Sequence, residues 1–89
     1  MSRPWFPFYV GDYLRDTGNL GALEHGAYLL LILHYWQHAD LPDDEEELAT
    51  ICRLTMPQWE KARPRLSRFF YDGWKHRRIE KELAKFAGL

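Results

Sequence analysis

The chain has 89 residues, enough for one domain with a modest core, and nearly half of them are hydrophobic, which excludes an intrinsically disordered protein. Its single cysteine, Cys52, excludes an internal disulfide and suits a reducing cytoplasm. The longest apolar run, residues 27–33, is too short to span a bilayer, and the N-terminus lacks the pattern of a signal peptide. We therefore expect a soluble, cytoplasmic, single domain over residues 1–89 with no membrane contact.

The charges are divided unevenly between the two halves of the chain. Residues 1–50 contain two basic and nine acidic side chains, a balance of −7, whereas residues 51–89 contain ten basic and four acidic ones, a balance of +6. The net charge of −1 therefore conceals a dipolar molecule. A cluster of basic residues on a compact element is typical of a nucleic-acid-binding surface, although two ordinary solvated faces of opposite sign would give the same counts.

The N-terminal segment, residues 1–11, is rich in aromatic residues and is interrupted by Pro4 and Pro7, which exclude a regular helix. We predict an extended arm there, followed by a short helical turn over residues 12–17. Exposed rings would invite association, so the arm is expected to cover part of the central helix. The rings expected to do so are Trp5, Phe8 and Tyr9.

Residues 23–38 give the clearest helix. Gly21 can serve as the N-cap, and Glu24 falls at the third helical position, which is half of a capping box. The segment is apolar on nearly every face. Such a helix is either central to its fold or buries a second face in a partner.

Two further helices follow, over residues 43–52 and 55–69. Asp43 is expected to cap the first, whose first turn is acidic and so favours the positive end of the helix dipole. Thr55 and Gln58 form a complete capping box at the start of the second. Because the link between the helices is short, the pair is predicted to be a helix-turn-helix.

The second helix of that pair has two distinct faces. At 100° per residue, an apolar arc is expected to face the core, whereas Lys61, Arg65 and Arg68 fall together on the opposite arc with Gln58 beside them. Three aligned cations on the outer face are what a recognition helix presents to DNA, and base specificity would come from Gln58 or Arg65. A solubilising surface with no ligand is the alternative. The apolar arc consists of Trp59, Ala62, Leu66, Phe69 and Phe70.

Asp72-Gly73 lies between residues of high strand propensity, a strong signal for a β-hairpin. The hairpin would carry Lys75, Arg77 and Arg78 to DNA phosphates and would lead into a last helix. The apolar face of that helix would be formed by Ile79, Leu83 and Phe86. The expected fold is therefore mainly α with a small β-hairpin, a winged helix-turn-helix.

Taken together, these segments resemble a prophage-associated family of unknown function, the YdaU-type proteins. The resemblance implies a phage or prophage origin in a bacterial host, often near replication genes, and a winged-helix domain similar to the N-terminal domain of phage replisome organisers. Relatives often continue beyond this domain, so the chain is either a fragment or a short stand-alone form. The matching residues are Pro7-Phe8-Tyr9, Asp12-Tyr13-Leu14, Asp16-Thr17, Glu24-His25-Gly26-Ala27-Tyr28-Leu29-Leu30, Tyr35-Trp36, Leu41-Pro42-Asp43, Trp59, Phe69-Phe70, Asp72-Gly73, Arg77 and Glu82-Leu83.

Two functional hypotheses remain open from the sequence. The first is a DNA-binding module for phage replication or its control, and the second is an adaptor that holds a host or phage protein. No phosphate loop, nucleophile elbow or dinucleotide fingerprint is present, so we expect no enzyme activity and no cofactor. His34 and His38 have a spacing that can bind a metal, but no further ligand motif accompanies them, and packing or surface roles are the simpler interpretation.

Overall fold

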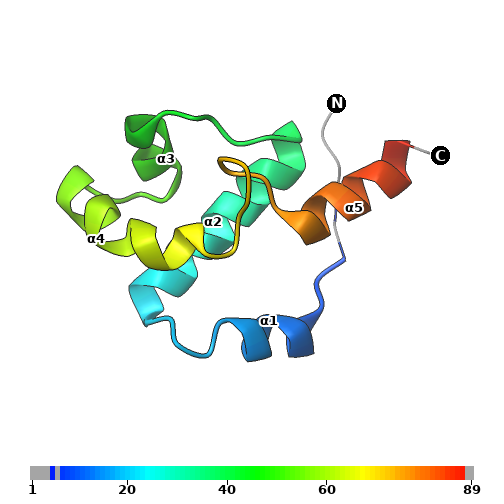
Figure 1. Ribbon diagram of the computed structural model, residues 1–89, viewed down its shortest axis with the longest axis horizontal. Coiled ribbons are helices and arrows are strands. Elements are labelled where there is room, and N and C mark those ends of the chain that lie inside the picture. Colours follow the sequence, from blue (N-terminus) through cyan, green and yellow to red (C-terminus); the bar gives the residue numbers. More distant parts are fainter. Residues whose placement is uncertain (1–4, 6, 88–89) are drawn as a thin grey trace.

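A computed structural model describes Trp5 and residues 7–87, the last two as backbone only. These residues form five helices and no strand (Figure 1). The helices are α1 (Val10–Asp16), α2 (Ala22–His38), α3 (Glu45–Ile51), α4 (Met56–Ser67) and α5 (Arg77–Ala87). None of the described helices combines the length and apolar character needed to cross a bilayer.

The helix α2 lies at the centre of the molecule, as predicted for a helix apolar on nearly every face. It contacts α3, α4 and α5, and Figure 1 shows α3 and α4 on one side of it and α5 on the other. Its buried residues form the middle of the core, to which α4 adds Trp59, Ala62 and Leu66. The buried residues of α2 are Ala27, Tyr28, Leu31, Ile32, Tyr35 and Trp36.

The local start signals in the sequence agree with the helix starts that the structure shows. At α2, Gly21 N donates to Glu24 Oε1 at 2.6 Å. At α4, Thr55 N donates to Gln58 Oε1 at 2.9 Å, and Gln58 N donates to Thr55 Oγ1 at 3.3 Å. Both predicted capping arrangements are therefore confirmed, because each depends on residues only three positions apart.

Two predicted boundaries are wrong. The N-cap of α3 is Asp44 and not Asp43, since Asp44 Oδ2 accepts from Glu47 N at 2.9 Å and three glutamates fill the first turn. The extended arm was predicted to reach residue 11, but α1 begins at Val10, where Tyr13 N donates to Tyr9 O at 2.9 Å. Residues 1–4 and 6 of the predicted arm lie outside the described residues.

The predicted winged helix is also wrong, because the described residues contain no β-hairpin. Tyr71 and Lys75 pair through two backbone hydrogen bonds of 2.8 and 3.0 Å, but this is a single isolated bridge. The predicted turn is present, with positive φ at Asp72 (46°) and Gly73 (84°). Strands cannot extend from it because buried Trp74 occupies the turn and α5 begins two residues after Lys75. The fold of the described residues is therefore all-helical.

Candidate nucleic-acid interface

The outer face of α4 carries the predicted basic residues into solvent. Lys61, Arg65 and Arg68 are exposed, on the side opposite the buried Trp59 and Leu66. Their spacing of four and then three residues keeps them on one side of the helix, over a length of about 10 Å at 1.5 Å per residue. The division into two faces predicted from the 100° spacing is therefore confirmed.

The three cations of this face differ in what they contact. The side chains of Lys61 and Arg68 make no ion pair or hydrogen bond within the described part of the chain, whereas Arg65 Nη1 lies 3.4 Å from Glu24 Oε2 of α2. Gln58 lies at the helix start, where Oε1 is occupied by the Thr55 amide. Because Oε1 already accepts this hydrogen bond, Gln58 can contact a base mainly through its amide nitrogen, as a hydrogen-bond donor.

The basic residues after α4 each contact a different partner in the fold. Lys75 Nζ lies 3.5 Å from Asp40 Oδ1, beyond the end of α2. The guanidinium of Arg77 lies 4.7 Å from the centre of the Tyr71 ring. Arg78 Nη2 donates to Asp12 Oδ2 at 2.9 Å, a bond that lowers the pKa of the Asp12 carboxyl.

A groove of about 500 Å³ brings three of the predicted residues together. Arg68 enters it from the end of α4, and Arg77 and Arg78 enter it from the start of α5. One carboxylate, Asp16, also lines it. The remaining wall is aromatic and consists of Tyr28, Phe69, Phe70, Tyr71 and His76. We call this feature the arginine groove.

A hydrogen-bonded network fixes the start of α5 and therefore the position of Arg77 and Arg78. Ile79 N donates to His76 Nδ1 at 3.3 Å, which makes His76 an N-capping side chain. His76 Nε2 lies 2.8 Å from the Tyr28 hydroxyl, and His76 N donates to the Tyr35 hydroxyl at 3.2 Å. Burial, with a smaller contribution from Arg78, lowers the pKa of His76 to about 4, so the ring is neutral near pH 7.

The neutral ring also has a defined tautomer. Because Nδ1 accepts from the Ile79 amide, the single ring proton must lie on Nε2, which then donates to the Tyr28 hydroxyl. The network thus joins the start of α5 to the central helix through uncharged partners. Glu80, one turn into α5, accepts from the Tyr35 hydroxyl and extends the same connection.

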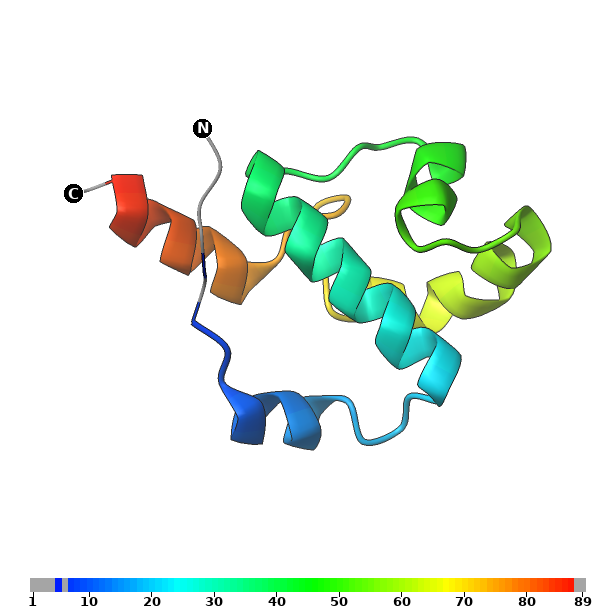
Figure 2. The ribbon, with the colours of Figure 1, turned by 180° about the vertical axis from the view of Figure 1, so that it is seen from behind.

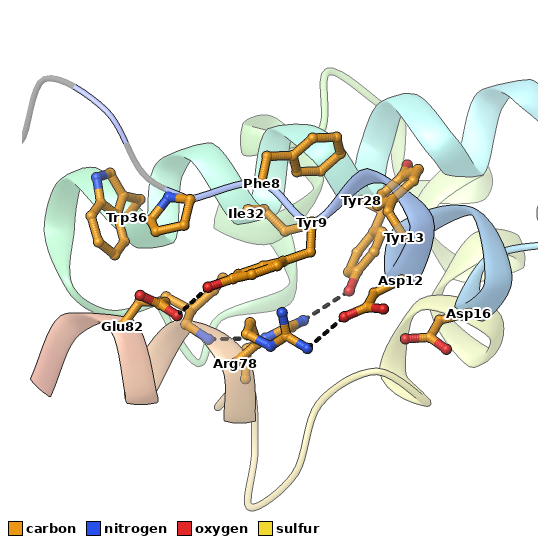
Figure 3. Close-up of a pocket in the computed structure, with 13 residues that line it drawn as sticks. Phe8, Tyr9, Asp12, Tyr13, Asp16, Tyr28, Ile32, Trp36, Arg78 and Glu82 are labelled. Carbon is orange, nitrogen blue, oxygen red and sulfur yellow. Dashed lines mark hydrogen bonds and ion pairs between the residues drawn. The ribbon is translucent and has the colours of Figure 1, made fainter. Parts of the chain in front are cut away.

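A second, smaller pocket of about 100 Å³ lies where the N-terminal segment meets α2 and α5 (Figure 3). The Tyr9 hydroxyl donates to Glu82 Oε2 at 3.2 Å, and the Arg78 guanidinium lies 4.2 Å from the centre of the Tyr9 ring. Phe8 packs on Tyr13 at 5.1 Å between ring centres. In Figure 2 the segment leading into α1 runs beside α5. Phe8 and Tyr9 are therefore docked on the domain, whereas Trp5 is 60% exposed.

The histidines considered as metal ligands are not joined by a third ligand among the described residues. His34 and His38 lie with ring centres 4.1 Å apart, and the pKa of His34 is lowered by burial and by His38. Within the described residues no group of three or more histidine, cysteine or acidic side chains could hold a metal ion. Burial raises the pKa of Cys52 to about 12, which keeps its thiol protonated.

Sequence reasoning missed the aromatic half of the arginine groove. Tyr71 was assigned only to a hairpin, although the Asp72-Gly73 turn folds the chain back so that Tyr71 and Arg77 meet. Phe69 and Phe70 were assigned to the core, and they line the groove as half-buried rings. Asp12 and Asp16 were expected only to form part of a short helical turn. No local signal places them beside cations more than fifty residues away.

The fold and site define a small domain whose described part has five helices and no strand, with an arginine-lined groove. The chain belongs to the family described as "Protein of unknown function (DUF1376)", whose model matches residues 4–84. It is 48% identical over 84 residues to "Uncharacterized protein YdaU" of Escherichia coli (strain K12). That match covers 91% of this chain and 29% of YdaU, so the chain spans less than a third of that relative. No solved structure matches the chain. The predicted resemblance to YdaU-type proteins is confirmed.

Proposed function

We propose that this chain is a non-enzymatic duplex-DNA-binding module whose contact surface is the outer face of α4 together with the arginine groove. The observation that supports the proposal is the convergence of Arg68, Arg77 and Arg78, from two different helices, on one groove lined by a single carboxylate. Arginine presents a planar fork of donors that matches phosphate oxygens. The role in initiating or controlling phage DNA replication is part of this proposal and is supported by the resemblance described above.

The length of the basic surface suits a duplex. Duplex DNA carries one phosphate charge per about 1.7 Å of its axis, so a row of cations about 10 Å long meets several phosphates. Arg65 and Arg78 are held by carboxylates on the protein, but the two arginine side chains are 56% and 42% exposed, and water screens such pairs so that they contribute little to stability. Phosphates can therefore replace Glu24 and Asp12 as partners when DNA binds.

The test is a fluorescence-anisotropy titration of labelled duplex DNA at several salt concentrations, with circular dichroism to confirm folding. Lys61→Ala and Arg68→Ala should each weaken binding and reduce the slope of log affinity against log salt by about one unit, because one fewer counterion is released. Arg65→Ala should lose less affinity, since Glu24 already competes for that side chain.

A matched control removes one exposed cation from elsewhere. Arg53 lies in the link before α4, at the opposite end of that helix from Arg68, and its φ is 58°. Arg53→Asn removes the charge and suits this left-handed backbone, so duplex affinity should stay within a small factor of the parent. A folded variant with Lys61, Arg65 and Arg68 all changed to Ala that binds duplex like the parent would refute the proposed surface.

The second candidate is a protein-binding adaptor, favoured by three exposed leucines on the central helix. Leu23, Leu29 and Leu33 are 48%, 40% and 42% exposed, although the same helix supplies most of the core. Binding to a protein that does not change with salt, together with no binding to duplex DNA, would favour this function over the first.

A further inference from the structure

Tyr71 is the aromatic side chain of the arginine groove that the fold leaves available. The residue is 38% exposed, and its ring contacts no other ring in the described part of the chain. The other rings of the wall are already in use: Phe69 stacks on Tyr28 at 4.7 Å between ring centres, and Phe70 lies edge-on to Trp74 at 5.1 Å. Arg77 contributes its guanidinium at 4.7 Å from the Tyr71 ring.

An exposed tyrosine among arginines has a specific use in nucleic-acid recognition. The bases of a duplex already stack on their neighbours, so a side-chain ring on the protein surface cannot reach their faces. An unpaired base offers its face to an aromatic ring while arginines hold the phosphates on either side. The groove, at about 500 Å³, lies within the range of pockets that hold small ligands, so there is room for a nucleotide.

The one carboxylate of the groove is consistent with the same ligand. Asp16 would repel a phosphate, but it can accept hydrogen bonds from N–H groups on the Watson–Crick edge of a base. That edge is free only when the base is unpaired. Asp16 and Tyr71 therefore both suit contact with an unpaired base.

We propose that the arginine groove binds an unpaired nucleotide of a single nucleic-acid strand. Arg68 and Arg77 contact the phosphates on either side of this nucleotide, its base stacks on Tyr71, and Asp16 faces the edge of the base. This inference rests on the proposed nucleic-acid-binding function. It adds that the groove prefers a single strand. The chain would then recognise junctions where a duplex opens into a single strand.

The test compares labelled oligo(dT), oligo(U) and a DNA duplex of equal length by fluorescence anisotropy. Tyr71→Leu should weaken binding of the better single strand by roughly 5- to 150-fold, the range for loss of one aromatic–base stack. Tyr71→Phe keeps the ring and should bind like the parent. Tyr71→Leu should weaken duplex binding much less than single-strand binding, because no base of a duplex stacks on the ring, whereas Arg68→Ala should weaken both. The ratio of oligo(dT) to oligo(U) affinity identifies which strand is preferred.

The outcomes separate this inference from the proposed function. If Tyr71→Leu, folded by circular dichroism, binds single strands like the parent, or if only duplex binds, the unpaired-nucleotide site is refuted while duplex binding stands. If none of the three probes binds, both are refuted. The variant should fold, because Tyr71 pairs with Lys75 through backbone atoms that the substitution retains.

Discussion

His76 should make the stability of the domain depend on pH. Its ring is buried at the start of α5, where Nδ1 accepts from the Ile79 amide and Nε2 donates to the Tyr28 hydroxyl. A second proton would have to be placed on Nδ1, directly against the Ile79 N–H donor. It would also bring a positive charge near Arg78, the charged residue that helps to lower this pKa. Protonation therefore opposes folding.

The sign and size of the effect follow from the two pKa values. The pKa of His76 falls from an ordinary 6.5 to about 4 in the folded chain, so on acidification the unfolded chain takes up the proton first. The stabilisation is complete above pH 6.5 and is lost progressively as the pH falls toward 4. Between about pH 7 and about pH 5 the loss amounts to about 2 kcal/mol. In a domain of this size, that lowers the melting temperature by roughly 8–16 °C.

The assay is urea unfolding followed by tryptophan fluorescence at these two pH values, with His76→Asn as the control. Asparagine caps helices well and can still accept from the Ile79 amide, but it does not titrate. Other titrating groups, including His34, are common to both proteins and cancel in the difference. The parent should lose about 2 kcal/mol more than the variant on acidification. Equal losses would show that His76 is not the group responsible.

Three further predictions concern the core, the groove and the N-terminal segment. Trp59→Ala should cost about 3–5 kcal/mol in urea unfolding, because this ring is fully buried; a cost well below that would contradict the packing described. Asp12→Asn should leave the melting temperature near that of the parent but raise duplex affinity in anisotropy, since it releases Arg78; unchanged affinity would remove Arg78 from the contact surface. Deleting the residues before Gly11 removes the contact of Tyr9 with α5 and should therefore lower the melting temperature by several degrees. This corresponds to a loss of stability on the order of 1–2 kcal/mol. An unchanged melting temperature would point to a segment reserved for a partner.

The parts of the fold that could be predicted are those with short-range causes. Thr55 and Gln58 satisfy each other's backbone groups at three residues' separation, so the start of α4 could be read from four letters. The turn at Asp72-Gly73 has the same character. The absence of a wing could not be predicted, because a turn dipeptide fixes the reversal of the chain and not the length of the segments that pair on either side of it. The length of the paired segments is limited by the burial of Trp74, whose ring packs on Trp59 and Phe70 in the folded chain.

In the candidate site, too, the features with local causes could be predicted and those that depend on distant residues could not. The spacing of Lys61, Arg65 and Arg68 correctly predicted one exposed face, because helical periodicity is local. The carboxylates that hold Arg65 and Arg78 come from α2 and α1, forty-one and sixty-six positions away in the sequence. A pattern search along the chain cannot find such partners. It also cannot find the arginine groove, which exists only because α5 begins beside the end of α4.

The ion pairs change the meaning of the uneven charge distribution. Four of them join an acid of the first half to a cation of the second: Asp12–Arg78, Glu24–Arg65, Asp40–Lys75 and Glu45–Arg63. Within the described residues, the acidic half therefore pairs with four of the ten cations of the basic half, and a net charge of −1 gives little long-range attraction to DNA. Binding of DNA to the proposed surface would then depend on local geometry, at the places where the side chains of Lys61 and Arg68 have no partner in the described part of the chain and where phosphates can displace Asp12 and Glu24. A domain built in this way would bind random duplex weakly and would favour structures that occupy the arginine groove as well as the face of α4.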